Sequence, residues 1–131
     1  MKDARQYIPL SDLEVYKLSR ELSRIGWEIY QGLDWKMQKV NGEQFIESTD
    51  STGANVAEGY GRYHFLDKIK FYYYARGSFL ECNEPWIELL KERDKVSEHL
   101  YKQYKETAEK FSKKLNNFIS TTYQAKSETT E

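Results

Sequence analysis

Apolar residues recur along the first third of the chain at the spacing of an amphipathic helix. The stripe consists of Val15, Leu18, Leu22, Ile25 and Ile29. Their spacings of three and four residues place them on one helix face. Ser11 and Glu14 have the positions of a capping box, and Gly32 is typical of a helix end. The pattern predicts a first helix from Ser11 to Gly32.

A second helix is predicted from Asp34, a favourable N-cap, to about Glu58. It contains the turn-type dipeptide Asn41-Gly42, so the pattern leaves open whether the helix is broken there. The segment Ser48 to Gly53 is polar and has small side chains, which allow a neighbouring helix to approach closely. Gly59-Tyr60-Gly61 follows, and we predict a helix end and tight turn there with glycine at positive φ.

The third predicted helix, from about Phe65 to Glu92, has two apolar seams with seven-residue spacing. One seam is Phe65, Tyr72, Phe79 and Trp86, and the other is Leu66, Tyr73, Leu80 and Ile87. Two seams make a face too wide for one buried contact, so we expect this helix to be central. Pro85 lacks a backbone N–H, which predicts a kink between Glu81 and Pro85.

A fourth helix is predicted after the polar connection at residues 93–95, with Ser97 as its N-cap. Its stripe is Leu100, Tyr104, Ala108, Phe111, Leu115, Phe118 and Thr122. The polar tail from Gln124 to Glu131 is expected to fray. Four helices with short connections predict an all-α fold, an antiparallel up-down-up-down four-helix bundle. We expect a single domain over residues 1–131 with its core in about residues 11–123.

Composition excludes several functional classes. The chain has 131 residues, and its 20 basic and 21 acidic residues nearly cancel, unlike a strongly basic nucleic-acid coat. Cys82 is the only thiol, and His64 and His99 are far apart, so no metal site and no cofactor is predicted. Met1 to Leu10 contains no apolar secretion signal, and no apolar run is long enough for a membrane span. We expect a cytoplasmic protein without a membrane partner.

The chain contains more aromatic residues than one core contact per helix requires. Eleven tyrosines are present, and Phe71-Tyr72-Tyr73-Tyr74 places rings around the whole helix circumference. Core packing plus a subunit interface is the favoured interpretation; a base-stacking platform and simple exposure are the alternatives. The residues predicted at an oligomer interface are Tyr16, Trp27, Tyr30, Tyr72, Tyr74 and Trp86.

Three sequence blocks resemble one protein family. They are Asp12-Leu-Glu-Val-Tyr-Lys17, Asn55-Val-Ala-Glu-Gly-Tyr-Gly-Arg62, and Ala75-Arg-Gly-Ser78 with Glu81. They resemble four-helix-bundle proteins encoded in intervening sequences of bacterial 23S ribosomal RNA genes, to which the accessory protein of diversity-generating retroelements is similar. The resemblance implies a homo-oligomeric ring, typically a pentamer, without established enzymatic activity. It also implies RNA or a nucleoprotein as the suggested partner.

The resemblance marks a set of structural motif positions. They are Asn55, Glu58, Gly59, Gly61, Arg62, Arg76, Gly77, Ser78 and Glu81. We expect Glu58, Arg62, Arg76 and Glu81 to form an ion-pair network at the corner between the second and third helices. A phosphate loop at Gly59–Arg62 is the weaker alternative, because neither a preceding strand nor a following Lys-Ser/Thr is present.

Three functional hypotheses follow. The first is a non-enzymatic, homo-oligomeric interaction protein, with no catalytic residues. The second is a nucleic-acid-binding module that uses Arg62, Lys68, Lys70 and Arg76 beside the aromatic run. The third is a small-ligand-binding bundle, which requires a pocket of convergent polar groups.

Overall fold

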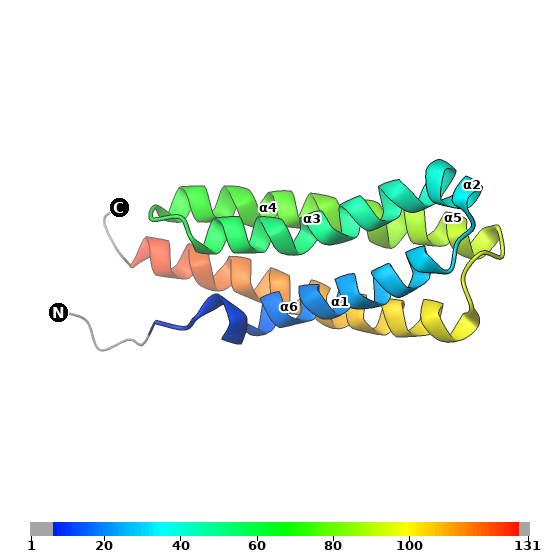
Figure 1. Ribbon diagram of the computed structural model, residues 1–131. Helices are drawn as coiled ribbons and strands as arrows, with labels where there is room; N and C mark the ends of the chain where they lie inside the picture. The colour runs from blue at the N-terminus through cyan, green and yellow to red at the C-terminus, as the bar shows by residue number, and fades with distance from the viewer. Residues whose placement is uncertain (1–6, 129–131) are drawn as a thin grey trace.

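The computed structural model describes residues 7–128, which form a bundle of four long helical segments (Figure 1). The elements in chain order are a 3-10 turn (Leu10–Asp12), α1 (Glu14–Gln31), α2 (Trp35–Met37), the π-helical turn η2 (Gln38–Gly42), α3 (Glu43–Tyr60), α4 (Phe65–Glu81), the π-helical turn η3 (Cys82–Trp86), α5 (Ile87–Glu92) and α6 (Glu98–Ser127). The second segment is α2–η2–α3 and the third is α4–η3–α5. The all-α four-helix prediction is confirmed.

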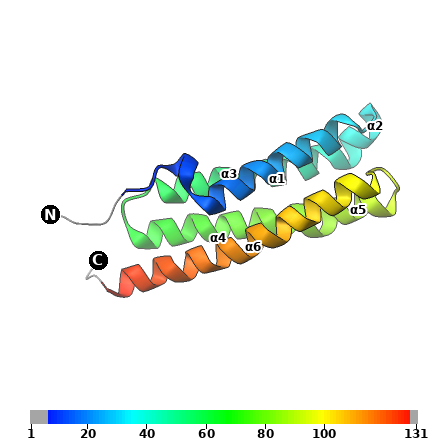
Figure 2. The ribbon, with the colours of Figure 1, turned by 90° about the horizontal axis from the view of Figure 1, so that it is seen from below.

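Successive segments run in opposite directions along the bundle (Figure 1). α1 packs against α3 and α6, and α4 packs against the same two helices. α1 and α4 therefore occupy diagonally opposite corners. Figure 2 shows the same arrangement from below, with the α3–α4 connection at the end where the described chain begins and finishes.

Two of the three predicted N-caps are confirmed. The Asp34 carboxylate accepts a hydrogen bond from the Met37 N–H at 2.9 Å, and the Ser97 hydroxyl accepts one from the Leu100 N–H at 3.1 Å. The prediction for Ser11 is wrong. Ser11 lies in the 3-10 turn, and α1 begins at Glu14 after an extended Leu13 that makes no side-chain cap.

The end of the fourth helix also differs from the prediction. α6 continues to Ser127, so residues 124–127 of the expected frayed tail are helical. Residues 129–131 of that tail lie outside the described residues.

The second helical segment is not broken at Asn41-Gly42. The backbone widens there into the π-helical turn η2, in which the Glu43 N–H donates to the Gln38 carbonyl. Asn41 is buried; its side-chain amide donates to the Trp86 carbonyl at 3.4 Å and accepts from the Arg93 guanidinium at 2.8 Å. Asn41 thus joins η2 to Trp86, the last residue of η3, and to Arg93, which follows α5.

The irregularity predicted around Pro85 takes the form of η3. In this π-helical turn the Ile87 N–H donates to the Cys82 carbonyl, five residues earlier. The Lys105 ammonium of α6 donates to both the backbone carbonyl and the side-chain oxygen of Asn83, at 2.8 and 2.9 Å. A side chain from a neighbouring helix therefore caps the widened turn, which is how the bundle accommodates a proline inside a helix.

The core is largely apolar but includes a buried contact between two hydroxyl groups of different helices. The fully buried side chains Phe45, Tyr104 and Phe111 lie at its centre, and the hydroxyls of Thr49 and Tyr104 are 2.8 Å apart. Burial raises the pKa of Tyr104 well above its usual value. Cys82 is fully buried beside them, and burial raises its thiol pKa.

Small residues bring α1 and α3 together, as the polar segment Ser48 to Gly53 predicted. A Cβ atom at Gly53 would lie 2.6 Å from the Ser19 hydroxyl, and one at Gly26 would lie 3.2 Å from the Thr49 methyl. Larger side chains at these positions would force the helices apart.

Candidate interaction surfaces

The connection between α3 and α4 holds most of the family-motif residues. α3 ends at Tyr60, and the following Gly61 has φ of −81°, so the predicted positive-φ glycine is absent from this corner. Gly59 instead lies inside the helix. A Cβ there would be 2.6 Å from the Tyr72 ring and 3.0 Å from the Lys68 carbonyl. Glycine is needed at this position because α4 approaches α3 closely, with its fully buried Tyr72 against the α3 backbone.

The expected four-residue ion-pair network is only partly present. Arg62 pairs with Glu58 at 2.6 Å. Arg76 points instead toward α6, where its guanidinium donates to the Asn116 side chain at 3.4 Å and lies over the Tyr73 ring. Glu81 is exposed and forms no ion pair within residues 7–128. Neither Arg76 nor Glu81 forms an ion pair with the corner residues Glu58 and Arg62 within residues 7–128.

The four residues predicted for nucleic-acid binding divide into separate groups. Arg62 and Lys70 share one ring, Phe71, with the Arg62 guanidinium 4.6 Å and the Lys70 ammonium 5.5 Å from its centroid. Lys68 turns inward and donates to the Tyr60 carbonyl at 2.9 Å. Arg76 is in the separate cluster beside α6. Only Arg62 and Lys70 are thus brought together around one exposed site.

The aromatic residues predicted on α1 lie along the side of α1 that faces α3. Trp27 is half exposed, and its ring stacks on that of Tyr30 with centroids 5.3 Å apart. Tyr30 in turn packs against Gly42, where a Cβ would lie 3.1 Å from its ring. Tyr16 is half-buried, and its hydroxyl accepts a hydrogen bond from Arg20 at 3.0 Å.

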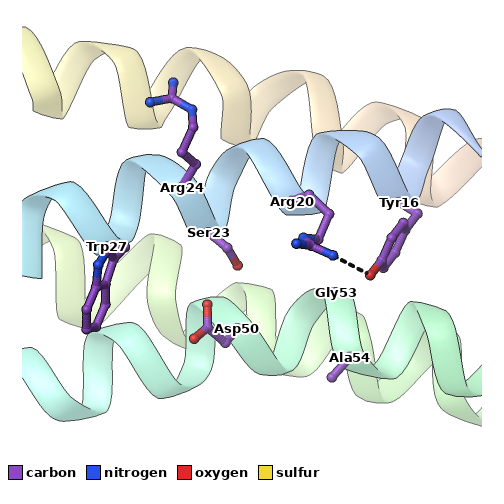
Figure 3. A pocket seen from close by; sticks show the side chains of 8 residues that line it. All are labelled: Tyr16, Arg20, Ser23, Arg24, Trp27, Asp50, Gly53 and Ala54. Carbon is purple, nitrogen blue, oxygen red and sulfur yellow. Dashed lines mark hydrogen bonds between the residues drawn. The ribbon is translucent and has the colours of Figure 1, made fainter. Parts of the chain in front are cut away.

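An open groove of about 480 Å³ lies between α1 and α3 (Figure 3). Small residues of α3 leave it hollow, and α1 contributes Tyr16, Arg20 and Trp27. Hydrogen bonding to Tyr16 raises the pKa of Arg20, which forms no salt bridge within the described chain. Arg24 is already paired with Glu21 at 2.6 Å. The groove therefore contains one guanidinium, that of Arg20, which no carboxylate of residues 7–128 contacts directly.

α3 adds one carboxylate, Asp50, to the opposite wall of this groove (Figure 3). The groove therefore has charges of both signs and an aromatic end at Trp27. Within residues 7–128 no group of three or more histidine, cysteine, aspartate or glutamate side chains is placed to hold a metal ion.

On the third segment, the prediction that Tyr72 lies at an oligomer interface is wrong. Only 1% of it is exposed, so it belongs to the core and is not available to a partner. Trp86 is half-buried and packs on the core. Tyr74 is half exposed and lies edge-on to Phe71, with ring centroids 5.4 Å apart.

Within α4 the second seam faces away from the core, whereas its last residue, Ile87, lies beyond η3 and is buried. Leu66 and Leu80 are each 61% exposed and Tyr73 is 39% exposed, whereas Phe79 of the first seam is buried. Lys70, Gly77 and Glu81 are exposed at neighbouring positions of the same helix side. We call this surface the outer face of α4; it consists of Leu66, Lys70, Tyr73, Gly77, Leu80 and Glu81.

Gly77 lies at the centre of the outer face. A Cβ there would meet nothing within 4 Å, and the residue lies well inside a regular helix. Glycine in a helix interior costs about 1 kcal/mol relative to alanine. Neither packing nor backbone conformation within the protomer requires glycine at this position. Sequence reasoning marked Gly77 only through the family motif, because its exposure depends on which seam of α4 faces the core.

Comparison with known proteins agrees with this fold. The structure resembles a crystal structure described as a protein of unknown function from the S23 ribosomal protein family of Bacteroides thetaiotaomicron VPI-5482, with a TM-score of 0.72 and 24% sequence identity. The match covers 79% of this chain and 96% of that one. No curated protein matches the sequence.

The described helices offer no membrane-crossing element: within residues 7–128 none combines the necessary length and apolar character. Residues 11–117 match the 23S rRNA-intervening sequence protein family over most of the chain. With its helical bundle and its Asn55–Arg62 and Arg76–Glu81 motifs, this chain belongs to the 23S rRNA-intervening sequence protein family.

Proposed function

We propose that this protein is a non-enzymatic interaction protein that assembles as a homo-oligomer through the outer face of α4. One observation carries the proposal: a glycine that the protomer does not require lies at the centre of an exposed apolar seam. A partner helix that packs closely against Gly77 would explain why this position has no side chain.

The exposed seam provides the driving force. Burying a leucine side chain that is otherwise exposed contributes about 1.5–3 kcal/mol. Leu66 and Leu80 retain most of their surface in the protomer, and Tyr73 adds a ring with a polar end. A contact over these residues would cover three apolar side chains, which are rarely left in a row on a monomer.

Native mass spectrometry of protein purified without nuclease tests the proposal. We expect a defined multiple of the 15.6 kDa protomer. Leu80→Glu should return the protein to monomer, because it places a charge in the covered seam. Val40→Glu is the matched control, since Val40 has similar exposure, 63%, but lies on η2. A wild-type monomer at micromolar concentration would reject the proposal.

The same measurement gives the number of subunits. The resemblance to ring-forming relatives predicts five, and this number stays a prediction. The half-buried Tyr16 and Tyr30 and the exposed Trp27 and Tyr74 remain candidates for any additional contact between copies.

One observation favours nucleic-acid binding as a second candidate. Phe71 is flanked by the two cations Arg62 and Lys70 and by the edge of Tyr74. Aromatic rings beside cations are the usual elements of a single-strand binding surface. Arg62 is partly neutralised by Glu58, which lowers the charge available to a phosphate.

Titration of single-stranded RNA at increasing salt tests this second candidate. Binding through Arg62 and Lys70 should weaken steeply as salt is raised, and Arg62→Gln should reduce both the affinity and the salt dependence. Lys114→Gln, on the exposed side of α6, is the control. Binding that does not respond to salt, or that Arg62→Gln leaves unchanged, would remove the candidate.

A further inference from the structure

The groove between α1 and α3 is suited to receive the outer face of α4 from another copy. α3 contributes the small residues Gly53 and Ala54 to the groove, and no carboxylate of residues 7–128 contacts its Arg20 guanidinium (Figure 3). We infer that the outer face of α4 of one copy docks into this groove of the next copy, with Glu81 beside Arg20. This inference rests on the proposed function and names the surface that the outer face contacts.

The two surfaces lie on different sides of the bundle. The groove opens between α1 and α3, whereas the outer face of α4 is turned toward α6, where the Tyr73 and Tyr123 hydroxyls are 3.5 Å apart. α1 and α4 occupy opposite corners (Figure 1). One copy can therefore contact two neighbours at once, one through each surface. Such a head-to-tail contact forms a ring when its rotation closes, which agrees with the ring that the family resemblance implies.

Contacts within the protomer place the groove and the outer face at the same height along the bundle. Gly53 of α3 lies against Ser19 of α1, and Gly59, six residues later in α3, lies against residues 68 and 72 of α4. Gly59 is thus level with about residue 70 of α4. Because α3 and α4 run in opposite directions, Gly53 and Ser19 are level with about residue 76, next to Gly77 (Figure 1).

Small residues meet at the centre of the contact. A ring whose axis runs along the helices keeps every residue at its own height. Gly77 of one copy then faces Ala54 in the groove of the next copy, because Ala54 adjoins Gly53. Neither side chain is larger than a methyl group, so the two helix backbones can approach closely. The exposed glycine of α4 therefore lies where the contact leaves least space.

Charge complementarity supports the same register. Glu81 is exposed and forms no ion pair within residues 7–128. It lies about one turn beyond Gly77, and its side chain points back toward the start of α4, which brings the carboxylate toward the height of Arg20. The exposed Arg20 guanidinium donates to the Tyr16 hydroxyl at 3.0 Å. Arg24 already forms ion pairs within α1, which leaves Arg20 as the partner of Glu81.

Apolar residues also come together in this register. Leu80 lies three residues beyond Gly77 and therefore reaches the half-exposed ring of Trp27, which points back along α1. Tyr73 lies four residues before Gly77 and is level with Tyr16. The contact covers Leu80, Tyr73 and Trp27 together, all of which are exposed in the protomer.

Exchange of the two charges tests the pairing. Arg20→Glu and Glu81→Arg each create a like-charge contact at every interface, and each should weaken self-association about tenfold. The double variant Arg20→Glu/Glu81→Arg restores every contact with the signs exchanged and should recover the wild-type mass distribution in sedimentation velocity. Lys114→Glu, an exposed charge reversal on α6, is the matched control and should change little. Circular dichroism checks that every variant remains helical.

Mixing the two single variants tests whether the contact is head-to-tail. In the mixture, Glu81 of one variant meets Arg20 of the other, and the arginine introduced at position 81 meets the glutamate introduced at position 20. Alternating copies therefore associate, although neither variant associates well alone. A ring with an odd number of subunits cannot alternate throughout, so its mixture should recover less association than the double variant does. A mixture that associates no better than its components would overturn the pairing.

Asp50 provides a graded measurement. It lies on the α3 wall of the groove, across from Arg20, and would repel the docked Glu81 (Figure 3). Asp50→Asn should therefore strengthen self-association about twofold in the same concentration series. Weaker association would show that Asp50 itself contacts the neighbouring copy, and would overturn the placement of Glu81.

Cross-linking between α3 and α4 provides an independent measurement. Ala54→Cys and Gly77→Cys should each stay unlinked alone, because each position faces the other and not its own copy. A mixture of the two single variants should give disulfide-linked dimers under mild oxidation, and the double variant should give a ladder of linked copies. Ser120→Cys, exposed on α6, is the control partner for Gly77→Cys and should not link to it, and the native Cys82 is buried.

The outcomes separate this inference from the proposed function. A wild-type monomer rejects both. An oligomer that Leu80→Glu dissociates, but that tolerates Arg20→Glu and gives no link between positions 54 and 77, keeps the outer face as an interface and overturns the groove as its partner. A link between two copies of Gly77→Cys alone would likewise overturn the head-to-tail contact.

Discussion

Two glycines of the family motif, Gly59 in α3 and Gly77 in α4, differ in the space around them. A Cβ atom at Gly59 would lie 2.6 Å from the buried Tyr72 ring, whereas one at Gly77 would meet nothing within 4 Å. The first glycine is explained by packing inside the protomer. No contact within the protomer explains Gly77, so a contact with another molecule is the remaining explanation. A motif residue is thus evidence of a fold or of a partner depending on what surrounds it.

The largest effect expected from this comparison is at Gly59. Gly59→Ala should lower the free energy of unfolding by about 1–3 kcal/mol, because neither the Tyr72 ring nor the Lys68 backbone has room to move. Urea denaturation measures the change. Gly61→Ala is the matched control: its Cβ would meet the nearest carbonyl at 3.7 Å, an ordinary contact. Equal effects at the two positions would contradict the packing explanation for Gly59.

The expected effect at Gly77 is smaller and has the opposite sign. Gly77→Ala should raise the free energy of unfolding of the free protomer by about 1 kcal/mol, since alanine is the better helix former and has space. The measurement is a urea titration at concentrations below the assembly range. Glu106→Ala, another exposed helix position, should change little. A destabilised Gly77→Ala protomer would show that the glycine has a role within the fold.

The same contrast explains which features were predictable from the sequence. Seven-residue periodicity located the helix of α4 and both of its seams, because period depends only on the chain itself. It did not decide which seam faces the core, and Tyr72 was therefore assigned to an interface although it is buried. That choice depends on where α3 and α6 lie. The need for glycine at position 59 likewise depends on the Tyr72 ring of another helix. Because the sequence does not show that contact, it favoured a glycine in a turn.

Local signals succeeded where the interaction is local. Asp34 and Ser97 cap helices through N–H groups three residues away. Ser11 has the same pattern but lies in a 3-10 turn, so the helix begins three residues later. Asn41-Gly42 is typical of a break, yet contacts to Trp86 and Arg93 hold it in a π-helical turn. Capping patterns were therefore reliable except where a competing turn or a distant contact intervened.

The smallest expected effect concerns Glu88, which contacts α6. Glu88 accepts hydrogen bonds from the Tyr101 hydroxyl at 2.9 and 2.8 Å and pairs with Lys105 at 3.1 Å. Burial alone would raise the pKa of Glu88, but the hydrogen bonds from Tyr101 and Lys105 outweigh it and hold the pKa below its usual value.

A carboxyl group with a lowered pKa in the folded state stabilises the protein when it is ionised, and this contribution is lost as the pH falls. Tyr101→Phe removes the hydrogen bonds and should cost below about 1 kcal/mol at neutral pH, because Glu88 is partly exposed. The difference from wild type should narrow as the pH falls from about 5 to 3. A constant difference for Tyr101→Phe would mean that ring packing, and not the ionised carboxylate, accounts for its cost.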